Sequence, residues 1–258
     1  MARAIANGDD GEARARGKRP VIAFDVDGTL APIVMDPAHA RIPRPTQQLL
    51  AALAADPGFL VAVVSARSER DLRRILPVRR IRRIAQYGLE GAIAPPAASR
   101  ATWRRRARRI RDLLEPIAAN TPGSWVEDKG MTVSLHDRLV RASTLPALRR
   151  ALRRAAVKAE RFGFSTEHGS RVTDFVPRGY DKGRAIEALR RSAQGAPVIY
   201  FGDSDADESA FAALGKDDVP VRVGPGKTRA RYRARNTADV ARFLRRLIDL
   251  RRASATRR

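Results

Sequence analysis

The 258-residue sequence contains no cysteine, which excludes a disulfide framework, a zinc–thiolate site and a cysteine nucleophile together. It has no uninterrupted run of about 18 or more apolar residues, so no transmembrane helix is predicted. Residues 1–19 lack the apolar segment of a secretory signal and are predicted to be a disordered leader. These absences favour a cytoplasmic protein whose stability rests on a hydrophobic core.

Aromatic residues are also scarce, at 5%, whereas basic residues are abundant and give a formal net charge of +23. A strongly basic chain is typical of nucleic-acid binding, but such proteins also need aromatic side chains on which bases stack. Most of the arginines are spread along the chain, on the polar faces of predicted amphipathic helices. We therefore interpret the charge as a solvated helix surface. Steering of anionic substrates or RNA binding is the alternative.

Short apolar runs alternate with helical patterns in both halves of the chain. Buried strands are predicted at 21–24, 59–64, 84–88, 198–201 and 219–223. Because helical patterns lie between these strands, the sequence predicts an α/β fold with a Rossmann-like, doubly wound parallel sheet.

The middle of the chain interrupts this alternation. A linker is predicted at 95–99, and it is followed by a helix, a hairpin, a second helix at about 145–161 and a second hairpin. This order is typical of a small α+β module inserted into a larger fold. We expect a core domain of residues 20–96 and 178–258 and an inserted cap domain of residues 97–177.

Polar side chains follow the ends of three predicted strands. Asp25 and Asp27 follow the first strand, Ser65 follows the second, and Asp203 and Asp207 follow the strand at 198–201. Ligands of open α/β sheets bind at the carboxyl ends of the strands, so these side chains should converge. Clustered carboxylates repel one another and require a cation, and oxygen ligands suit Mg²⁺. Because a carboxylate can also attack phosphorus, the pattern favours phosphoryl transfer.

The segment Asp25-Val26-Asp27-Gly28-Thr29 resembles the first motif of the haloacid dehalogenase superfamily. Ser65, Lys182 and the pair Asp203 and Asp207 resemble its second, third and fourth motifs, in the same order. The position of the insertion matches the larger cap type of this superfamily. The resemblance implies a core of the haloacid dehalogenase type.

Within the superfamily, residues 20–247 are similar to the trehalose-6-phosphate phosphatases. The specific matches are residues 126–138 of the predicted cap, the Asp-Lys-Gly at 181–183 and the Gly-Asp-x-x-x-Asp-Glu at 202–208. This resemblance implies hydrolysis of trehalose 6-phosphate, the final step of trehalose biosynthesis, through an aspartyl-phosphate on Asp25.

The resemblance also implies a role for each matching residue. Asp25 would be the nucleophile, and Asp27 would be the general acid and base. The implied ligands of the phosphoryl oxygens are Ser65, Thr29 and Lys182. The implied ligands of Mg²⁺ are Asp25, Asp27, Asp203 and Asp207. The implied substrate contacts in the sugar-binding part of the site are Glu127, Lys129, Asp174 and Arg67.

The sequence departs from the family pattern at several positions. Ser204 stands where the family usually has Asp, and Ala66 stands where it has Gly. Tyr87 occupies the His position of a Gly-Asn-His-Gly-x-Glu segment, and Asp174 replaces a Glu. None of these changes affects the implied nucleophile or acid, so we expect intact catalysis, with sugar specificity the property most exposed to change.

Two other functions stay open from the sequence. One is a related Mg²⁺-dependent phosphatase that acts on another sugar phosphate, such as a sucrose or glucosyl-glycerate phosphate. The other is a basic nucleic-acid-binding protein on the same scaffold, although the catalytic set favours a monomeric enzyme with a small-molecule substrate. Asp205 and Glu208 could support the site or only start a helix. The scattered histidines are predicted to be structural, namely His39, His136 and His168.

Overall fold

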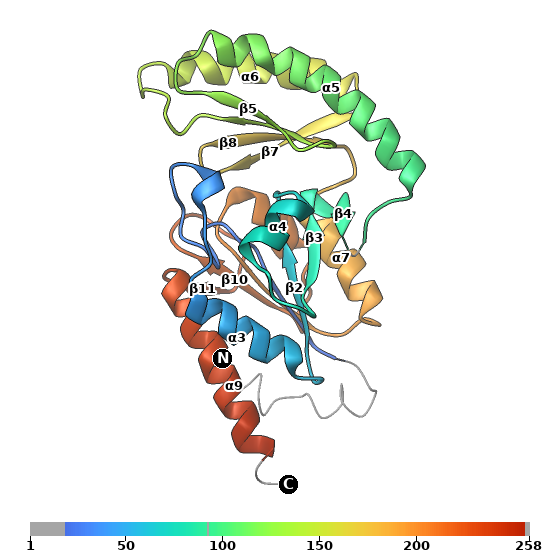
Figure 1. Ribbon diagram of the computed structural model, residues 1–258, viewed down its shortest axis with the longest axis vertical. Helices are drawn as coiled ribbons and strands as arrows, with labels where there is room; N and C mark the ends of the chain where they lie inside the picture. The colour runs from blue at the N-terminus through green and yellow to red at the C-terminus, as the bar shows by residue number, and fades with distance from the viewer. Residues whose placement is uncertain (1–18, 92, 256–258) are drawn as a thin grey trace.

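The computed structural model of this chain describes residues 19–91 and 93–255, so the predicted leader, apart from Arg19, lies outside the described residues. The described chain forms a seven-stranded sheet and a separate four-stranded sheet. Figure 1 shows the smaller sheet above the larger one, with two long helices, α5 and α6, on its outer side.

The larger sheet has the strand order β11-β10-β9-β1-β2-β3-β4, and every neighbouring pair is parallel except β3 and β4. Its strands are β1 (Val21–Phe24), β2 (Leu60–Val64), β3 (Arg82–Ala85), β4 (Glu90–Gly91), β9 (Val198–Gly202), β10 (Val219–Val223) and β11 (Tyr232–Ala234). The three central strands, β1, β2 and β9, are buried along their whole length. Continuous apolar runs of this kind are typical of parallel strands that are covered on both faces. The predicted α/β fold with a parallel sheet is confirmed.

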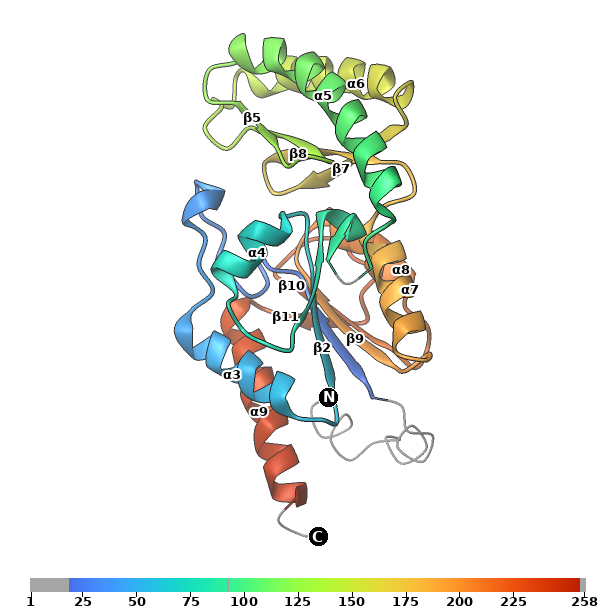
Figure 2. The ribbon, with the colours of Figure 1, turned by 45° about the vertical axis from the view of Figure 1, so that its right-hand side comes forward.

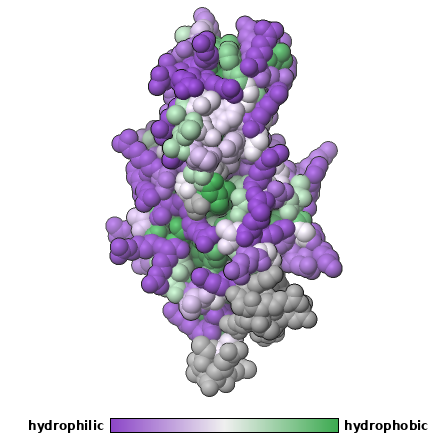
Figure 3. Space-filling view, turned by 90° about the vertical axis from the view of Figure 1, so that its right-hand side faces the viewer, coloured by the Kyte–Doolittle hydropathy of each residue, from purple (hydrophilic) through white to green (hydrophobic). Residues whose placement is uncertain are grey.

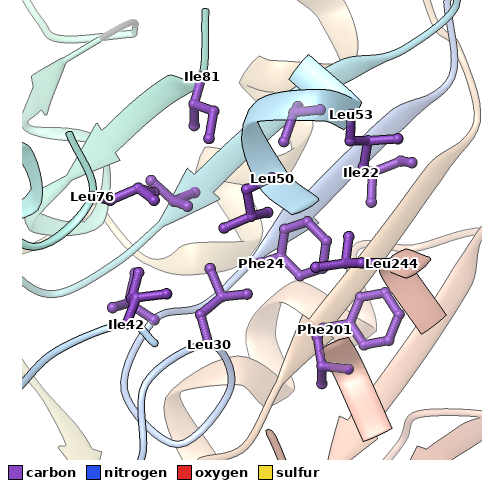
Figure 4. Close-up of a cluster of buried hydrophobic side chains, with 14 of the residues drawn as sticks. Ile22, Phe24, Leu30, Ile42, Leu50, Leu53, Leu76, Ile81, Phe201 and Leu244 are labelled. Atoms are coloured by element: carbon purple, nitrogen blue, oxygen red, sulfur yellow. The ribbon is translucent and has the colours of Figure 1, made fainter. Parts of the chain in front are cut away.

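Helices cover both faces of the larger sheet. One face packs on α3 (Arg44–Ala55), α4 (Glu69–Ile75) and α9 (Thr237–Ala255), and the other on α7 (Lys182–Ser192) and α8 (Glu208–Ala212). Successive residues of a strand point to opposite faces, so Phe24 joins the first layer and Ala23 the second. Figure 4 shows Phe24 beside Phe201 and Leu50, with the two rings stacked 5.2 Å apart. Burial of each such side chain contributes about 1.5–3 kcal/mol.

The smaller sheet is antiparallel and has the strand order β5-β6-β8-β7. Its elements are α5 (Ala97–Ala119), β5 (Trp125–Asp128), β6 (Val133–His136), α6 (Leu145–Glu160), β7 (Phe164–Gly169) and β8 (Val172–Pro177). Ala107, Ile110 and Leu114 recur at helical spacing on α5 and pack on one face of this sheet, against Phe164 and Phe175. The opposite face therefore looks toward the larger sheet (Figure 2).

Two boundaries differ from the sequence prediction. The strand predicted at 84–88 ends at Ala85, because Gln86 and Tyr87 take left-handed backbone angles, with φ of 45° and 58°. The linker predicted at 95–99 is wrong beyond Pro96, since α5 begins at Ala97. The edge strands β4 and β11 were not predicted, because two or three residues carry no readable alternation.

Arginines are exposed on the helix surface, as both interpretations of the charge require, so the role of the charge stays a prediction. In the described part of the chain, no helix combines the length and the apolarity that crossing a bilayer requires. Figure 3 shows hydrophilic side chains gathered over the end of the molecule where α5 and α6 lie. The exposed arginines of these two helices include Arg104, Arg105, Arg108, Arg149, Arg150 and Arg153.

Candidate functional site

A cavity of about 100 Å³ lies between the carboxyl ends of the larger sheet's central strands and the facing side of the smaller sheet. Its lining includes most of the site residues that the sequence predicts. From the larger sheet and its loops come Asp25, Asp27, Ser65, Arg67, Lys182 and Asp203. From the smaller sheet come Glu127, Lys129 and Asp174.

Asp25 follows β1 directly and is 5% exposed. The Nζ of Lys182, the first residue of α7, lies 2.9 Å from Asp25 Oδ1. Asp25, Asp203 and Asp207 each offer an oxygen within 4.8 Å of the others. Gly28, with φ of 80°, allows this approach, because a Cβ there would collide with the Asp203 carboxylate. The four sequence motifs therefore meet at one edge of the sheet.

Asp207 is fully buried, and both of its carboxylate oxygens are engaged. Oδ1 accepts hydrogen bonds from Lys182 Nζ and the Tyr200 hydroxyl, each at 2.7 Å. Oδ2 accepts from the backbone N–H of Asp203 at 3.0 Å and from the N–H and hydroxyl of Ser204 at 2.9 Å. Asp207 thus holds Lys182 and the start of the Asp203 loop in place.

The electrostatics of this cluster call for a further cation. Burial raises the pKa of Asp25 well above its usual value; Lys182 lowers it, but Asp207 and Asp203 raise it again. Burial and the Asp207 charge raise the pKa of Asp203 to about 6. Burial alone would lower the pKa of Lys182, but Asp207 and Asp25 raise it, so the ammonium stays charged. One lysine cannot balance three clustered carboxylates, two of which are buried and one half-buried.

The donor set fits a divalent cation. The Oδ1 atom of Asp203 is buried and has no hydrogen-bond partner, and it lies in the cluster with an oxygen of Asp25. Carboxylate oxygens are the preferred ligands of Mg²⁺, which binds through one or two carboxylates and keeps several waters. Asp25 and Asp203 are therefore the carboxylates available to an ion, whereas Asp207 is saturated by its donors.

Arg67 forms a bidentate ion pair with Asp27, the second aspartate of the first motif. Its Nε donates to Asp27 Oδ2 at 2.7 Å and its Nη2 to Asp27 Oδ1 at 2.8 Å, a bidentate pair that fixes the carboxylate. Ser65 is 1% exposed, lines the cavity, and its Oγ accepts from the Arg67 N–H at 3.2 Å. Thr29 is buried beside this motif, but its hydroxyl has no hydrogen-bond partner and does not line the cavity.

The hairpin of β5 and β6 contributes polar side chains to the lining of the cavity. Glu127 Oε2 lies 2.8 Å from His136 Nε2 and 3.8 Å from Lys129 Nζ. Burial would raise the pKa of Glu127, but the His136 hydrogen bond and the Lys129 charge lower it to about 2. His136 stacks on Trp125, with ring centroids 4.7 Å apart, and lines the cavity, so its assignment as merely structural was incomplete. The signal was its diagonal position to Glu127 in the hairpin.

Asp174 on β8 is buried, and both of its oxygens have partners. Oδ2 accepts from the Tyr87 hydroxyl at 2.7 Å, and Oδ1 accepts from Lys129 Nζ at 3.2 Å and from the Ser134 hydroxyl. Burial would raise the pKa of Asp174, but Lys129 and the hydroxyl donors lower it, so the group is ionised. Two positions that depart from the family pattern, Tyr87 and Asp174, thus contact each other.

Asp205 and Glu208, whose roles the sequence left open, do not line the cavity. Glu208 Oε2 accepts from the Arg229 N–H at 2.8 Å, and its Oε1 lies 3.4 Å from Arg222 Nη1. Asp205 is exposed at the start of a short 3₁₀ turn, Asp205–Asp207. Glu208 therefore anchors a neighbouring loop, and neither residue joins the carboxylate cluster around Asp25.

The family described as trehalose-phosphatase matches residues 23–238, which is most of the chain. This chain belongs to the trehalose-phosphatase family. The smaller sheet, the larger sheet apart from the first two residues of β1, and the residues that line the cavity fall within the matched range.

Curated relatives agree with this membership, and a solved structure shares the fold. The chain is 29% identical to the trehalose-6-phosphate phosphatase of Escherichia coli, over 84% of this chain and 82% of that protein. It is 31% identical to a bifunctional trehalose-6-phosphate synthase/phosphatase of Thermoproteus tenax, over 85% of this chain but only 30% of that longer protein. The C-terminal domain of a C. albicans trehalose-6-phosphate phosphatase has the same fold, with a TM-score of 0.80, 23% identity and coverage of 90% and 93% of the two chains.

Proposed function

We propose that this protein hydrolyses trehalose 6-phosphate to trehalose and phosphate. The observation that carries the proposal is the buried cluster of Asp25, Lys182 and Asp203 at the floor of a cavity whose opposite wall offers Glu127 and Lys129. The floor suits a phosphoryl group, because it combines a nucleophile, a fixed ammonium and carboxylates for a divalent cation. The wall suits sugar hydroxyls, because it offers hydrogen-bond acceptors and donors side by side.

The reaction takes two steps at phosphorus. An oxygen of Asp25 attacks the phosphorus atom and forms an aspartyl-phosphate while the bond from phosphorus to the sugar oxygen breaks. Asp27 enters this step protonated, with one of its two hydrogen bonds from Arg67 released, and gives its proton to the departing sugar oxygen. A water molecule then attacks the same phosphorus, Asp27 takes its proton, and phosphate leaves as the Asp25 carboxylate is restored.

The other residues hold charge and position. Lys182 and Ser65 contact phosphoryl oxygens, and Asp207 keeps the Lys182 ammonium oriented. Asp25 and Asp203, with the backbone carbonyl of Asp27, would hold Mg²⁺, as the unpartnered Asp203 oxygen supports. When bound, Mg²⁺ neutralises the carboxylates and withdraws charge from the phosphoryl group.

Residues 97–177 act as the cap in this proposal. The cap places Glu127, Lys129 and His136 over the sugar and excludes bulk water from the aspartyl-phosphate. The division into a core of residues 20–96 and 178–258 and this cap stays a prediction, as do the monomeric state and the cytoplasmic location. Thr29, the last residue of the first motif, is buried and does not line the cavity, so this proposal gives it no contact with the phosphoryl group.

A second candidate is hydrolysis of a different sugar phosphate by the same chemistry. One observation favours it: the carboxylate of Asp174, which the sequence assigned to the sugar, is engaged by Tyr87, Lys129 and Ser134. A sugar that needs no ligand at this position would fit equally well.

Trapping the covalent intermediate tests the proposal. In Asp27→Asn, loss of the base slows attack by water, so phosphoryl groups should accumulate on the enzyme during turnover of p-nitrophenyl phosphate with Mg²⁺, because this leaving group needs no general acid in the first step. Mass spectrometry of acid-quenched digests should find one phosphoryl group on the peptide that contains Asp25. Asp217→Asn, an exposed site remote from the cavity, is the matched control and should turn over normally. Phosphate release by Asp25→Asn at the wild-type rate would overturn the proposal.

A further inference from the structure

The turn between β3 and β4 connects the two halves of the site. Gln86 and Tyr87 are almost completely buried and both adopt positive φ, an arrangement that is rare for residues other than glycine. Such strained residues persist only where their surroundings over-determine them. Here the Gln86 N–H donates to the Arg67 carbonyl at 2.9 Å, and the Tyr87 N–H donates to the Ser65 carbonyl at 3.2 Å. The turn is therefore attached to the segment that carries Ser65, a predicted phosphate ligand, and Arg67, a predicted substrate contact.

Both side chains of this turn reach into the smaller sheet. Gln86 Nε2 donates to the Lys129 carbonyl at 2.8 Å, and Gln86 Oε1 accepts from the Thr132 N–H at 3.1 Å and hydroxyl at 2.9 Å. The Tyr87 hydroxyl donates to Asp174 at 2.7 Å. Two adjacent residues of the core thus bind the β5–β6 turn and the β8 strand together. We name residues 86–87 the latch turn.

The carboxylate of Asp174 is the centre of this contact. It receives hydrogen bonds from Tyr87, Lys129 and Ser134, and it is 2% exposed. These three donors leave one acceptor position, on Oδ2, and the low exposure of the residue leaves little room for a sugar hydroxyl to reach it. The hydrogen bonds of Asp174 instead hold the Lys129 ammonium and the Tyr87 hydroxyl in fixed positions.

The volume of the cavity shows why the hydrogen bonds between the latch turn and the smaller sheet matter for substrate entry. About 100 Å³ is well below the roughly 300–1,000 Å³ of typical small-molecule sites. A disaccharide phosphate is larger than this cavity alone, so either it extends into the adjoining cavity of about 550 Å³, which shares Asp203, Ser204 and Ser170, or the smaller sheet moves away from the larger one. The hydrogen bonds of the latch turn cross the same boundary, so separation of the sheets must break or strain them.

We propose that the latch turn holds the cap closed, and that the Tyr87–Asp174 hydrogen bond sets the position of Lys129 in the cavity. Asp174 is then a positioning residue and not a sugar ligand. This inference rests on the proposed function for its substrate, but the contact itself is independent of which sugar is bound.

A double-mutant cycle tests the role of the pair. Tyr87→Phe and Asp174→Asn should each lower kcat/KM for trehalose 6-phosphate by roughly ten- to a hundredfold, the range of a hydrogen bond to a charged group. The double variant should be no worse than the worse single variant, because both remove the same contact. The loss should be much smaller with p-nitrophenyl phosphate, which has no sugar for the cap to hold. Equal losses with both substrates, or additive losses, would overturn the proposal. Tyr232→Phe, an exposed tyrosine on β11, is the matched control.

The absence of cysteine allows a direct measurement of closure. Spin labels on Ala55→Cys in α3 and Val157→Cys in α6 occupy exposed sites on the two halves. Electron–electron resonance should give a main short distance in the otherwise wild-type protein and an added, longer population after Tyr87→Phe. Unchanged distances would refute the latch. Suppose that Tyr87→Phe gives the longer population but the wild-type protein does not hydrolyse trehalose 6-phosphate. That result would support the latch and refute the proposed substrate.

Discussion

Replacement of Lys182 by Met tests how strongly the site depends on a single buried cation. The lysine is 3% exposed, and its ammonium lies 2.9 Å from Asp25 and 2.7 Å from Asp207. Methionine has a similar shape but no charge, so the substitution removes the ammonium while largely preserving the packing. Two buried carboxylates then lose their ion-pair partner.

The magnitude follows from the burial of the partners. Removing one member of a buried ion pair costs about 3–5 kcal/mol, because the remaining charge is left without compensation. Neither Asp25 nor Asp207 is exposed enough for water to screen it. For a chain of this size the loss corresponds to a Tm about 6–20 °C lower, at about 2–4 °C per kcal/mol.

The loss of unfolding free energy in Lys182→Met should change with pH in a definite direction. Without the ammonium, the pKa of each neighbouring carboxyl in the folded state rises above its value in the unfolded state. Stability conferred by a raised folded-state pKa is lost as pH rises, so the deficit of Lys182→Met should be small near pH 5 and grow toward pH 8. Urea unfolding in EDTA at both pH values measures it, with the exposed Lys158→Met as control. A deficit below about 1 kcal/mol at pH 8, or one that does not change with pH, would refute the reasoning.

Three further predictions concern the metal, the cap and the acid. Asp203→Asn should abolish the rise in Tm that Mg²⁺ gives the wild type, and an undiminished rise would remove Asp203 from the metal site. Burial, with Asp181 and Asp174, raises the pKa of Glu167 from 4.5 to about 7. The wild type therefore loses stability as the pH rises from the unfolded-state pKa of Glu167 toward 7. Glu167→Gln should be more stable than the wild type by about 1–2 kcal/mol at pH 8 but not at pH 5. An equal difference in unfolding free energy at both pH values would contradict this. Arg67→Lys breaks the bidentate grip on Asp27 and should lower kcat by roughly tenfold with little change in Tm, whereas an unchanged kcat would show that the grip is dispensable.

The convergence of the site could be predicted because it follows from strand direction. Asp25, Ser65 and Asp203 each come after a buried parallel strand, and the carboxyl ends of such strands meet at one edge. The apolar runs were long enough to identify these strands without knowledge of their neighbours. Family resemblance added Lys182, which precedes a helix and carries no local signal of its own.

The features that escaped prediction depend on contacts between distant segments. The latch turn at 86–87 adopts positive φ because Ser65 and Arg67 carbonyls bind its N–H groups, and nothing in its own sequence indicates this. The pairing of Tyr87 with Asp174 joins residues 87 positions apart. The sequence marked both as departures from a family pattern, but only the fold shows that they are partners.

The most direct test of the account is the release of phosphate by the wild-type protein with Mg²⁺. Trehalose 6-phosphate, sucrose 6-phosphate and glucose 6-phosphate should be compared by kcat/KM, with Asp25→Asn as the inactive control. The account predicts a preference of at least tenfold, about 1.4 kcal/mol, for the trehalose ester. Comparable rates on all three esters would contradict the proposed substrate, and full activity of Asp25→Asn would contradict the chemistry.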